Sequence, residues 1–136
     1  GVPATSEGTV DAPLARSATD RKKIVIVRGE RGKRAVTHWR RLKVGRDSAR
    51  IECRLETGRT HQVRVHMASV GHPLVGDPVY GRSGKALKDV LKRLNFNRQA
   101  LHAAHLGFTH PITKNSLSFE SPIPEDMQEL FTALGV

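Results

Sequence analysis

The densest group of chemically capable side chains lies between residues 57 and 81. Guanidinium, imidazole and amide donors follow one another closely there, on Arg59, His61, Gln62, Arg64 and His66. Such donors suit a phosphate group or the polar edge of a base. The backbone must turn sharply or approach a partner closely at Gly58, Gly71, Gly76 and Gly81. The stretch therefore predicts a site for an anionic, hydrogen-bonding ligand.

Two ordered motifs resemble those of a known enzyme family. The first runs through TGRTHQVRVH (57–66), GHP (71–73) and GDPVYG (76–81), and the second through RQALHA (98–103) and FTHP (108–111). Together they resemble the RluA family of RNA pseudouridine synthases, with a likeness that extends from about Gly8 to about Leu134. The resemblance implies part of the pseudouridine synthase catalytic fold and an RNA substrate, most like the members that modify large-subunit ribosomal RNA of the 23S type. It implies no cofactor and no metal.

The motif that carries the family's nucleophile does not occur in these residues. In the family, an aspartate in an HRLDxxTSG segment attacks the uridine, and an active-site tyrosine follows. Here Tyr80 is the only tyrosine, and it belongs to the GDPVYG loop. We therefore expect the chain to be the C-terminal part of such an enzyme, inactive on its own. Residues 24–136 would belong to the catalytic domain, and residues 1–23 would be mostly disordered or loop.

Arg64 is the supporting catalytic residue that the resemblance implies. The matching arginine of the family pairs with the catalytic aspartate, and a neighbouring positive charge keeps a carboxylate ionised for nucleophilic attack. From spacing alone, an arginine on the helix surface paired with a residue such as Glu56 would be the simpler interpretation. The family match favours the catalytic role.

Three neighbours of Arg64 are candidate RNA-binding residues. Arg59 precedes a predicted helix, where free backbone N–H groups also favour a phosphate, and His61 and Gln62 could clamp an extruded nucleotide. Capping by Thr60 would explain the same helix start without a ligand. In the second motif, His102 is expected to be structural, bonded to a backbone carbonyl.

The histidines do not form a recognisable metal motif. His61 and His66, like His105 and His110, are separated by four residues, which does not match HExxH, and a single cysteine provides no thiolate set. We predict no metal site.

Positive charge is concentrated in the first half of the chain. Residues 1–64 hold 16 Lys or Arg against 7 acids, and residues 65–136 hold 7 against 6. Such a field favours phosphate-rich partners, although a solvated basic surface would look similar. Cys53 cannot form an internal disulfide and lies in an alternating strand pattern, which fits a reducing, cytoplasmic location. No apolar run is long enough to cross a bilayer.

Periodicity predicts an α+β fold with a mixed, largely antiparallel sheet and flanking helices. Strands are expected at 24–27 and 35–44, joined as a hairpin, then at 48–56, 100–108 and 116–120. Trp39 is expected in the core. A helix should follow Gly58, with Val63, Met67 and Val70 on one face, Arg64 on another, and Gly71 at its end. Two further helices are predicted from the apolar sets Leu87, Val90, Leu91, Leu94 and Met127, Leu130, Phe131, Leu134.

Two other functions remain open at this point. One is a basic RNA-binding module without chemistry. The other is an assembly piece that associates with itself through exposed sheet edges.

Overall fold

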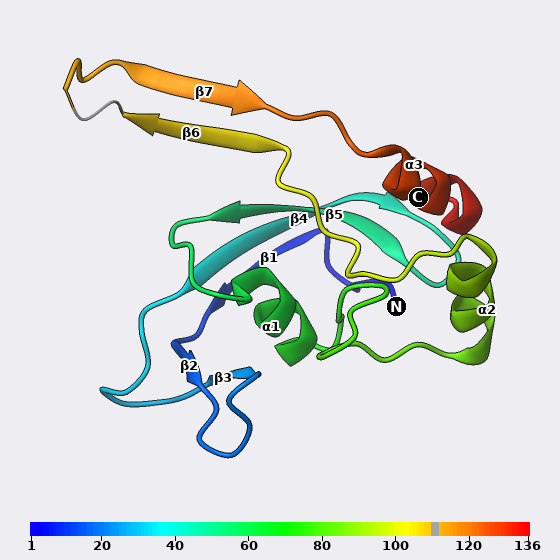
Figure 1. Cartoon of the computed structure of the whole chain (residues 1–136), viewed down its shortest axis with the longest axis horizontal. Helices are drawn as coiled ribbons and strands as arrows, with labels where there is room; N and C mark the ends of the chain where they lie inside the picture. Colours follow the sequence, from blue (N-terminus) through cyan, green and yellow to red (C-terminus); the bar gives the residue numbers. More distant parts are fainter. Residues whose placement is uncertain (110–111) are drawn as a thin grey trace.

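The computed structural model describes residues 1–109 and 112–136, with Phe108 and Thr109 described in backbone only (Figure 1). Within those ranges the chain forms strands and helices in the order β1 (Glu7–Asp11), β2 (Leu14–Arg16), β3 (Ile24–Ile26), β4 (Val36–Val44), β5 (Ala49–Leu55), α1 (Gln62–Ser69), α2 (Lys85–Arg93), β6 (His105–Thr109), β7 (Ser116–Glu120) and α3 (Glu125–Leu134). All strand pairs among these are antiparallel. The predicted α+β class is confirmed.

Strand β4 is the centre of a three-stranded sheet, with β1 on one side and β5 on the other. Its buried Trp39 lies opposite Gly8 of β1 and Cys53 of β5. A Cβ at Gly8 would come within 2.7 Å of the indole, so the glycine allows the ring to lie across β1. The strand expected at 48–56 is confirmed and pairs with β4, and the core position of Trp39 is confirmed as well.

The expected hairpin between 24–27 and 35–44 is wrong. Strand β3 pairs with β2, because both edges of β4 are occupied by β1 and β5. The basic segment between β3 and β4 instead returns to the start of β2, where Leu14 and Lys33 exchange backbone hydrogen bonds of 2.9 and 2.8 Å. Residues 1–23, expected to be mostly loop, therefore supply two strands to the fold.

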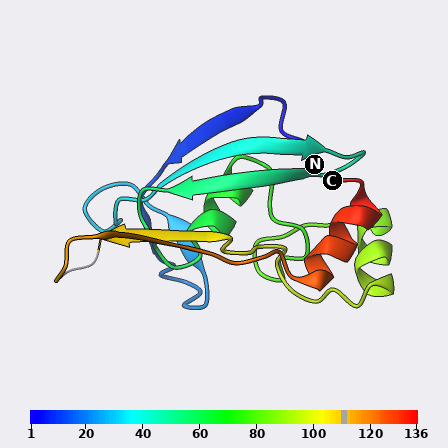
Figure 2. The same cartoon turned by 90° about the horizontal axis from the view of Figure 1, so that it is seen from above.

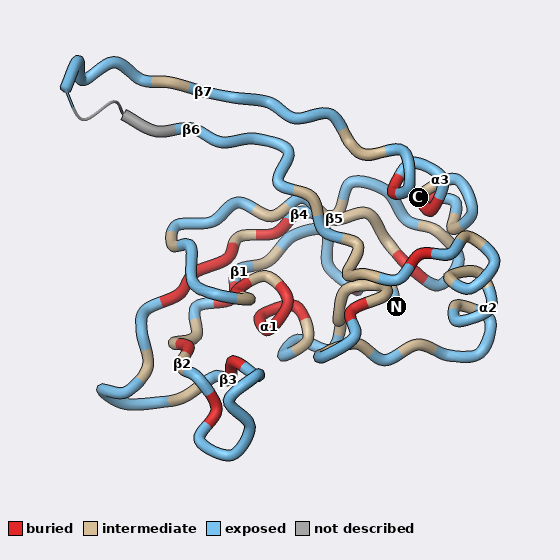
Figure 3. Tube along the Cα trace, in the orientation of Figure 1, coloured by how far each residue is buried: buried red, intermediate tan, exposed pale blue. Residues whose placement is uncertain are grey.

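Helix α1 packs against the sheet and is buried on more than one face (Figures 1 and 3). Val65 joins a core cluster with Leu14, Ile24 and Ala35, while Met67 joins another with Val10 and Trp39. The expected helix and its end near Gly71 are confirmed, since Val70 is the C-cap. Val63 and Met67 pack in the same cluster and Arg64 turns instead to Asp77, as expected, whereas Val70 is 43% exposed and not part of that face's core.

Helices α2 and α3 pack together beside the turn between β4 and β5. Leu130, Met127 and Phe96 form their shared core, and both helices agree with their predicted apolar positions. A Cβ at Gly45 in the β4–β5 turn would meet the Leu134 carbonyl oxygen at 2.4 Å, which shows how closely α3 approaches this turn.

Strands β6 and β7 form a hairpin that extends away from the body (Figure 2). Strand β6 begins at His105, later than the expected Ala100. The expected turn at 110–115 and the FTHP motif fall partly outside the described residues. Among the helices described, the longest has ten residues, and none has the length and hydropathy to cross a bilayer.

Candidate functional site

Arg64 lies in the first turn of α1 and forms a buried, two-point ion pair with Asp77. Its Nε donates to Asp77 Oδ2 at 2.8 Å and its Nη2 donates to Oδ1 at 2.9 Å. The Asp77 side chain is fully buried and that of Arg64 is 9% exposed. This planar, charge-assisted geometry fixes the guanidinium in one orientation. The surface pairing with Glu56 considered above is wrong, because Glu56 binds Arg34 and His38 instead.

The loop after α1 is built around the Asp77 carboxylate. Its Oδ1 also accepts hydrogen bonds from the backbone N–H groups of Val79 and Tyr80. Burial raises the pKa of Asp77, but the hydrogen bonds from Arg64 and from these amides outweigh it and leave the pKa below its ordinary value. The Asp77 hydrogen bond in turn raises the pKa of Arg64. Both groups are therefore charged at neutral pH.

One edge of the Arg64 guanidinium is not used by Asp77. Within the described chain, Nη1 has no hydrogen-bond partner. The described side-chain nitrogens that are both fully buried and without a partner are Arg50 Nε and His72 Nδ1. Arg64 Nη1 is not one of them. Nη1 thus retains contact with solvent. The Tyr80 ring lies alongside, with its centroid 5.1 Å from Arg64 Cζ. The site presents a fixed cation with one available N–H edge beside an aromatic ring.

His61 lies next to this cation in a left-handed backbone conformation, with φ 55° and ψ 20°. Its Nδ1 is 2.8 Å from the Tyr80 hydroxyl, which also accepts the Ile24 amide at 2.9 Å. The amide uses one lone pair of the hydroxyl, whose own proton is free to go to His61 Nδ1; in that arrangement the hydrogen of the neutral ring is on Nε2. Burial and then the charge of Arg64 lower the pKa of His61, against an opposing effect of Asp77. A neutral imidazole is thus held beside Arg64.

Gln62, expected to contact RNA, uses its whole amide inside the protein. Its oxygen accepts from Thr57 Oγ1 and from the Arg59 amide, and its nitrogen donates to Val36 O and Thr37 Oγ1. The residue is 3% exposed. These bonds tie the loop before α1 to β4, which is a positioning role rather than a surface contact.

The hydrogen-bond path continues through the second histidine of the motif. The Gln62 amide donates to the Thr37 hydroxyl, which lies 2.8 Å from His66 Nδ1, and His66 Nε2 lies 2.9 Å from Ala12 O. The carbonyl can only accept, so Nε2 carries the hydrogen and Thr37 donates to Nδ1. His66, buried completely, connects α1 with β4 and with the end of β1.

Arg59 lies at the entrance to α1 and is exposed. Its Nε donates to Arg34 O at 2.9 Å, and within the described chain its other guanidinium nitrogens have no hydrogen-bond partner. The N-cap of α1 is His61, without a side-chain hydrogen bond, so capping by Thr60 is wrong. An uncapped helix start next to an exposed arginine suits an anion.

The remaining predicted residues have structural environments. His102 Nε2 lies 3.1 Å from Ser121 O, which confirms its expected bond to a backbone carbonyl. Burial raises the pKa of the Cys53 thiol to about 11, which makes it a poor nucleophile. Across the described ranges, no three His, Cys, Asp or Glu side chains converge as metal ligands would.

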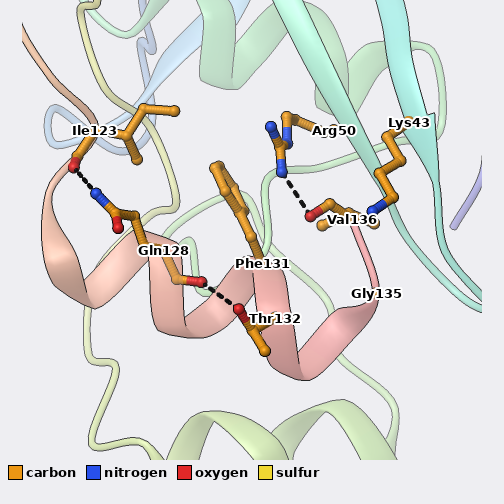
Figure 4. Close-up of a pocket in the computed structure, with 8 residues that line it drawn as sticks. All are labelled: Lys43, Arg50, Ile123, Gln128, Phe131, Thr132, Gly135 and Val136. Atoms are coloured by element: carbon orange, nitrogen blue, oxygen red, sulfur yellow. Dashed lines mark hydrogen bonds between the residues drawn. The ribbon is translucent and has the colours of Figure 1, made fainter.

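A groove of about 640 Å³ lies elsewhere, between β4–β5 and α3 (Figure 4). Its central cation, Arg50, lies 4.2 Å from the centroid of the Phe131 ring and donates to Val136 O at 2.7 Å. None of the residues predicted for the site lines this groove. Arg50 holds the C-terminal segment against β5, and we assign the groove to packing.

Sequence reasoning missed Asp77 and Tyr80 as members of the site. Both belong to the GDPVYG loop, where a Gly-Asp pair before a turn is the signal of a carboxylate that caps the following amides. Gly76, with φ +78°, gives the loop its sharp entry. The signal for the turn was present, whereas the ion pair across 13 residues had no local signal.

Comparison with known proteins assigns the family. A sequence model described as RNA pseudouridylate synthase matches residues 2–69, which is half of the chain. The chain belongs to the RNA pseudouridylate synthase family. The match includes α1 and Arg64, and the RluA-type resemblance found in the motifs is confirmed.

Curated relatives of this family extend the similarity over nearly the whole chain. The ribosomal large subunit pseudouridine synthase D of Zymomonas mobilis is 61% identical over 130 residues, covering 96% of this chain. The uncharacterized RNA pseudouridine synthase YlyB of Bacillus subtilis is 48% identical over 134 residues, and the synthase D of Escherichia coli is 45% identical over 135. The chain spans 41% of the length of each of these relatives.

Solved structures of the family share the fold. Human RNA Pseudouridylate Synthase Domain Containing 4 matches with a TM-score of 0.70 and 27% identity, over 98% of this chain and 58% of the human one. Human RNA Pseudouridylate Synthase Domain Containing 1 matches with a TM-score of 0.70 at 23% identity, over 100% of this chain and 62% of that one. The expected pseudouridine synthase fold is confirmed.

Proposed function

We propose that this chain is the C-terminal part of the catalytic domain of an RNA pseudouridine synthase that acts on large-subunit ribosomal RNA, and that it is inactive alone. In the mechanism that the family resemblance implies, an aspartate attacks the uridine, the glycosidic bond breaks, and the uracil turns and rejoins the sugar through carbon. Arg64 would hold that aspartate. The aspartate itself would come from a part of the protein outside these residues. The protein would act in the cytoplasm.

The observation that carries this proposal is the half-used guanidinium of Arg64. Asp77 binds Nε and Nη2 and leaves Nη1 at the solvent edge. An incoming carboxylate at Nη1 would meet a cation that is already oriented, at little further entropic cost. Asp77 itself is an unsuitable nucleophile, because four donors from three residues already occupy its buried oxygens.

The flanking residues would bind the nucleotide. The Arg59 guanidinium is exposed at the uncapped start of α1, where a phosphate is favoured. His61 would offer its Nε2–H to the extruded base beside Tyr80. Gln62 would act indirectly, by fixing the loop that carries both.

A chimeric enzyme tests the proposal. This chain replaces the matching 130 residues of the Zymomonas mobilis relative, and turnover is followed as tritium release from RNA labelled at uridine C5. The chimera should release tritium and its Arg64→Met variant should not. Arg40→Met, which removes a cation from the exposed pair with Glu52 and lies outside both motifs, should retain turnover. Tritium release by the isolated 136 residues, or undiminished release by the Arg64→Met chimera, would contradict the proposal.

A non-catalytic RNA-binding module is the second candidate, favoured by the net charge of +10. It predicts RNA binding with a steep salt dependence and a chimera that never turns over. Self-association is a separate expectation, because the outer edges of β1 and β5 have no neighbouring strand in the described sheet. Sedimentation over a range of concentrations would detect it.

A further inference from the structure

The segment from Arg16 to Arg34 carries more than half of the chain's net positive charge. Its 19 residues include eight Lys or Arg and two acids, which gives +6 of the total +10. They include the last residue of β2, the whole of β3 and the loops after each of these strands. All eight cations are exposed.

Three exposed arginines around this segment are oriented by backbone carbonyls. Arg16 Nη1 donates to Arg21 O at 2.6 Å, and Arg31 Nη1 donates to Arg16 O at 2.9 Å. Arg59 Nε donates to Arg34 O at 2.9 Å. None of the three has an acidic partner in the ranges that the structure describes. Each guanidinium donates one N–H to a neutral carbonyl oxygen, so its positive charge is not compensated.

These arginines lie beside the candidate site. The Ile24 amide of β3 binds the Tyr80 hydroxyl, which also contacts His61. The charge of Arg16 is close enough to contribute to the lowered pKa of His61. Arg59 belongs to the loop that leads into α1, and its bond to Arg34 attaches that loop to the basic segment. The hairpin β2–β3 and α1 are neighbours in Figure 1.

We propose that Arg16, Arg31 and Arg59 form a phosphate-binding surface that holds the RNA backbone on either side of the modified uridine. This inference rests on the proposed function and adds the residues that dock the substrate. A guanidinium already held at one N–H loses less entropy when its remaining fork binds a phosphate. RNA is favoured over an acidic protein because three separate forks suit a line of phosphates, each able to accept two N–H bonds.

Helix α2 supplies a matched control of equal charge. Lys85, Lys88 and Lys92 are exposed and, within the described chain, have no ion-pair or side-chain hydrogen-bond partner. They lie on the opposite side of the molecule from β2–β3 (Figure 1). A triple Lys→Gln variant there removes three charges without touching the proposed surface.

The experiment measures the salt dependence of binding to a hairpin RNA of large-subunit ribosomal sequence, by fluorescence anisotropy. The variant Arg16→Gln/Arg31→Gln/Arg59→Gln keeps an amide donor at each position but removes the charge. Its slope of log affinity against log salt should be shallower than that of the unmodified chain by about 2 to 3, since each phosphate contact contributes roughly 0.7 to 0.9. The α2 variant should change the slope by less than about 1.

Each other outcome has a defined meaning. Equal changes in the two triple variants, or no change in the arginine variant, would overturn the inference while leaving the proposed function standing. Equally strong competition by polyaspartate of the same total charge would also overturn it, since an acidic protein would then serve as well. Single variants Arg16→Gln and Arg31→Gln, each expected to shift the slope by about 0.7 to 0.9, replace the triple variant if it does not fold.

The chimera separates this inference from the proposed function. If the chimera binds RNA but releases no tritium, the catalytic proposal is wrong and the proposed arginine surface still stands. Absence of RNA binding by the unmodified chain would remove the surface, whereas a chimera that still turned over would retain the function.

Discussion

The Arg64 guanidinium and the Asp77 carboxylate meet through two parallel hydrogen bonds, 2.8 and 2.9 Å long, inside the protein. The pair connects the first turn of α1 with the loop that follows the helix. Arg64 is therefore a structural cation, and the proposed function adds a second role for it, in which Nη1 would bind the nucleophilic carboxylate.

Asp77→Asn should destabilise the chain strongly. The change leaves the Arg64 charge buried without its counter-ion, which typically costs about 3 to 5 kcal/mol. Urea denaturation followed by circular dichroism measures the loss. Asp89→Asn on exposed α2 is the control and should change the free energy of unfolding by less than about 0.5 kcal/mol. A small effect of Asp77→Asn would show that the pair contributes little to stability.

Acid should weaken the fold through Asp77. Its pKa is lower in the folded chain than the ordinary value of about 3.9, so the unfolded chain binds more protons between the two values. The stabilisation is complete above about pH 4 and is lost as the pH falls through the folded pKa. Unfolding free energies measured from pH 6 downward should show this decrease, and the decrease should be smaller in Asp77→Asn.

His61 should add a second pH dependence at higher pH. Its pKa lies below the ordinary value of about 6.5 because of burial and the Arg64 charge. Its contribution to stability is present above that value and is lost as the pH falls through the folded pKa. Titration of the imidazole by NMR should give a value below 6.5, and Arg64→Met should raise it. An unchanged value in that variant would rule out the Arg64 charge as a cause.

Gln62→Ala should destabilise the fold by about 2 to 4 kcal/mol. It removes four hydrogen bonds and leaves buried partners such as Val36 O unsatisfied. Gln128→Ala on α3 removes one exposed bond, to Ile123 O, and should cost less than about 1 kcal/mol. Equal losses in a chemical denaturation series would argue against a positioning role for Gln62.

Gly76→Ala should be far more harmful than Gly58→Ala. A Cβ at Gly76 would lie 2.3 Å from Arg98 O at a φ of +78°, whereas nothing lies within 4 Å of a Cβ at Gly58. The expected cost is about 2 kcal/mol or more for Gly76→Ala and below about 1 kcal/mol for Gly58→Ala. Thermal melts of the two variants would compare them directly, and similar melting temperatures would contradict the strain argument.

Helices and strands with strong periodicity could be predicted from the sequence. Which strand pairs with which could not. The alternation of β5 and the apolar spacing of α2 and α3 are local properties of the sequence, and the structure confirms them. The pairing of β3 with β2 depends on contacts between distant segments, such as Leu14 with Lys33. Local patterns carry no information on which of two compatible strands is the neighbour.

The candidate site was predicted in part for the same reason. The motif gave Arg64, His61 and Arg59 as candidates that the structure places around the start of α1, whereas Gln62, expected to clamp a nucleotide, is only 3% exposed. Only the three-dimensional arrangement shows Thr37 and Val36 on β4 in reach of that amide. Asp77, the partner of Arg64, lies in a loop whose turn could be predicted from its residue types. The sequence did not predict that this loop folds back against α1.

The projecting β6–β7 hairpin divides the chain into parts that should open independently. Leu106 and Phe119 face each other in register and are 60% and 55% exposed, so the hairpin gains little from the main body. Its amide protons should exchange with deuterium through local opening, long before those of β4, which require the whole sheet to separate. Exchange rates would thus show two classes of backbone protection within one short polypeptide.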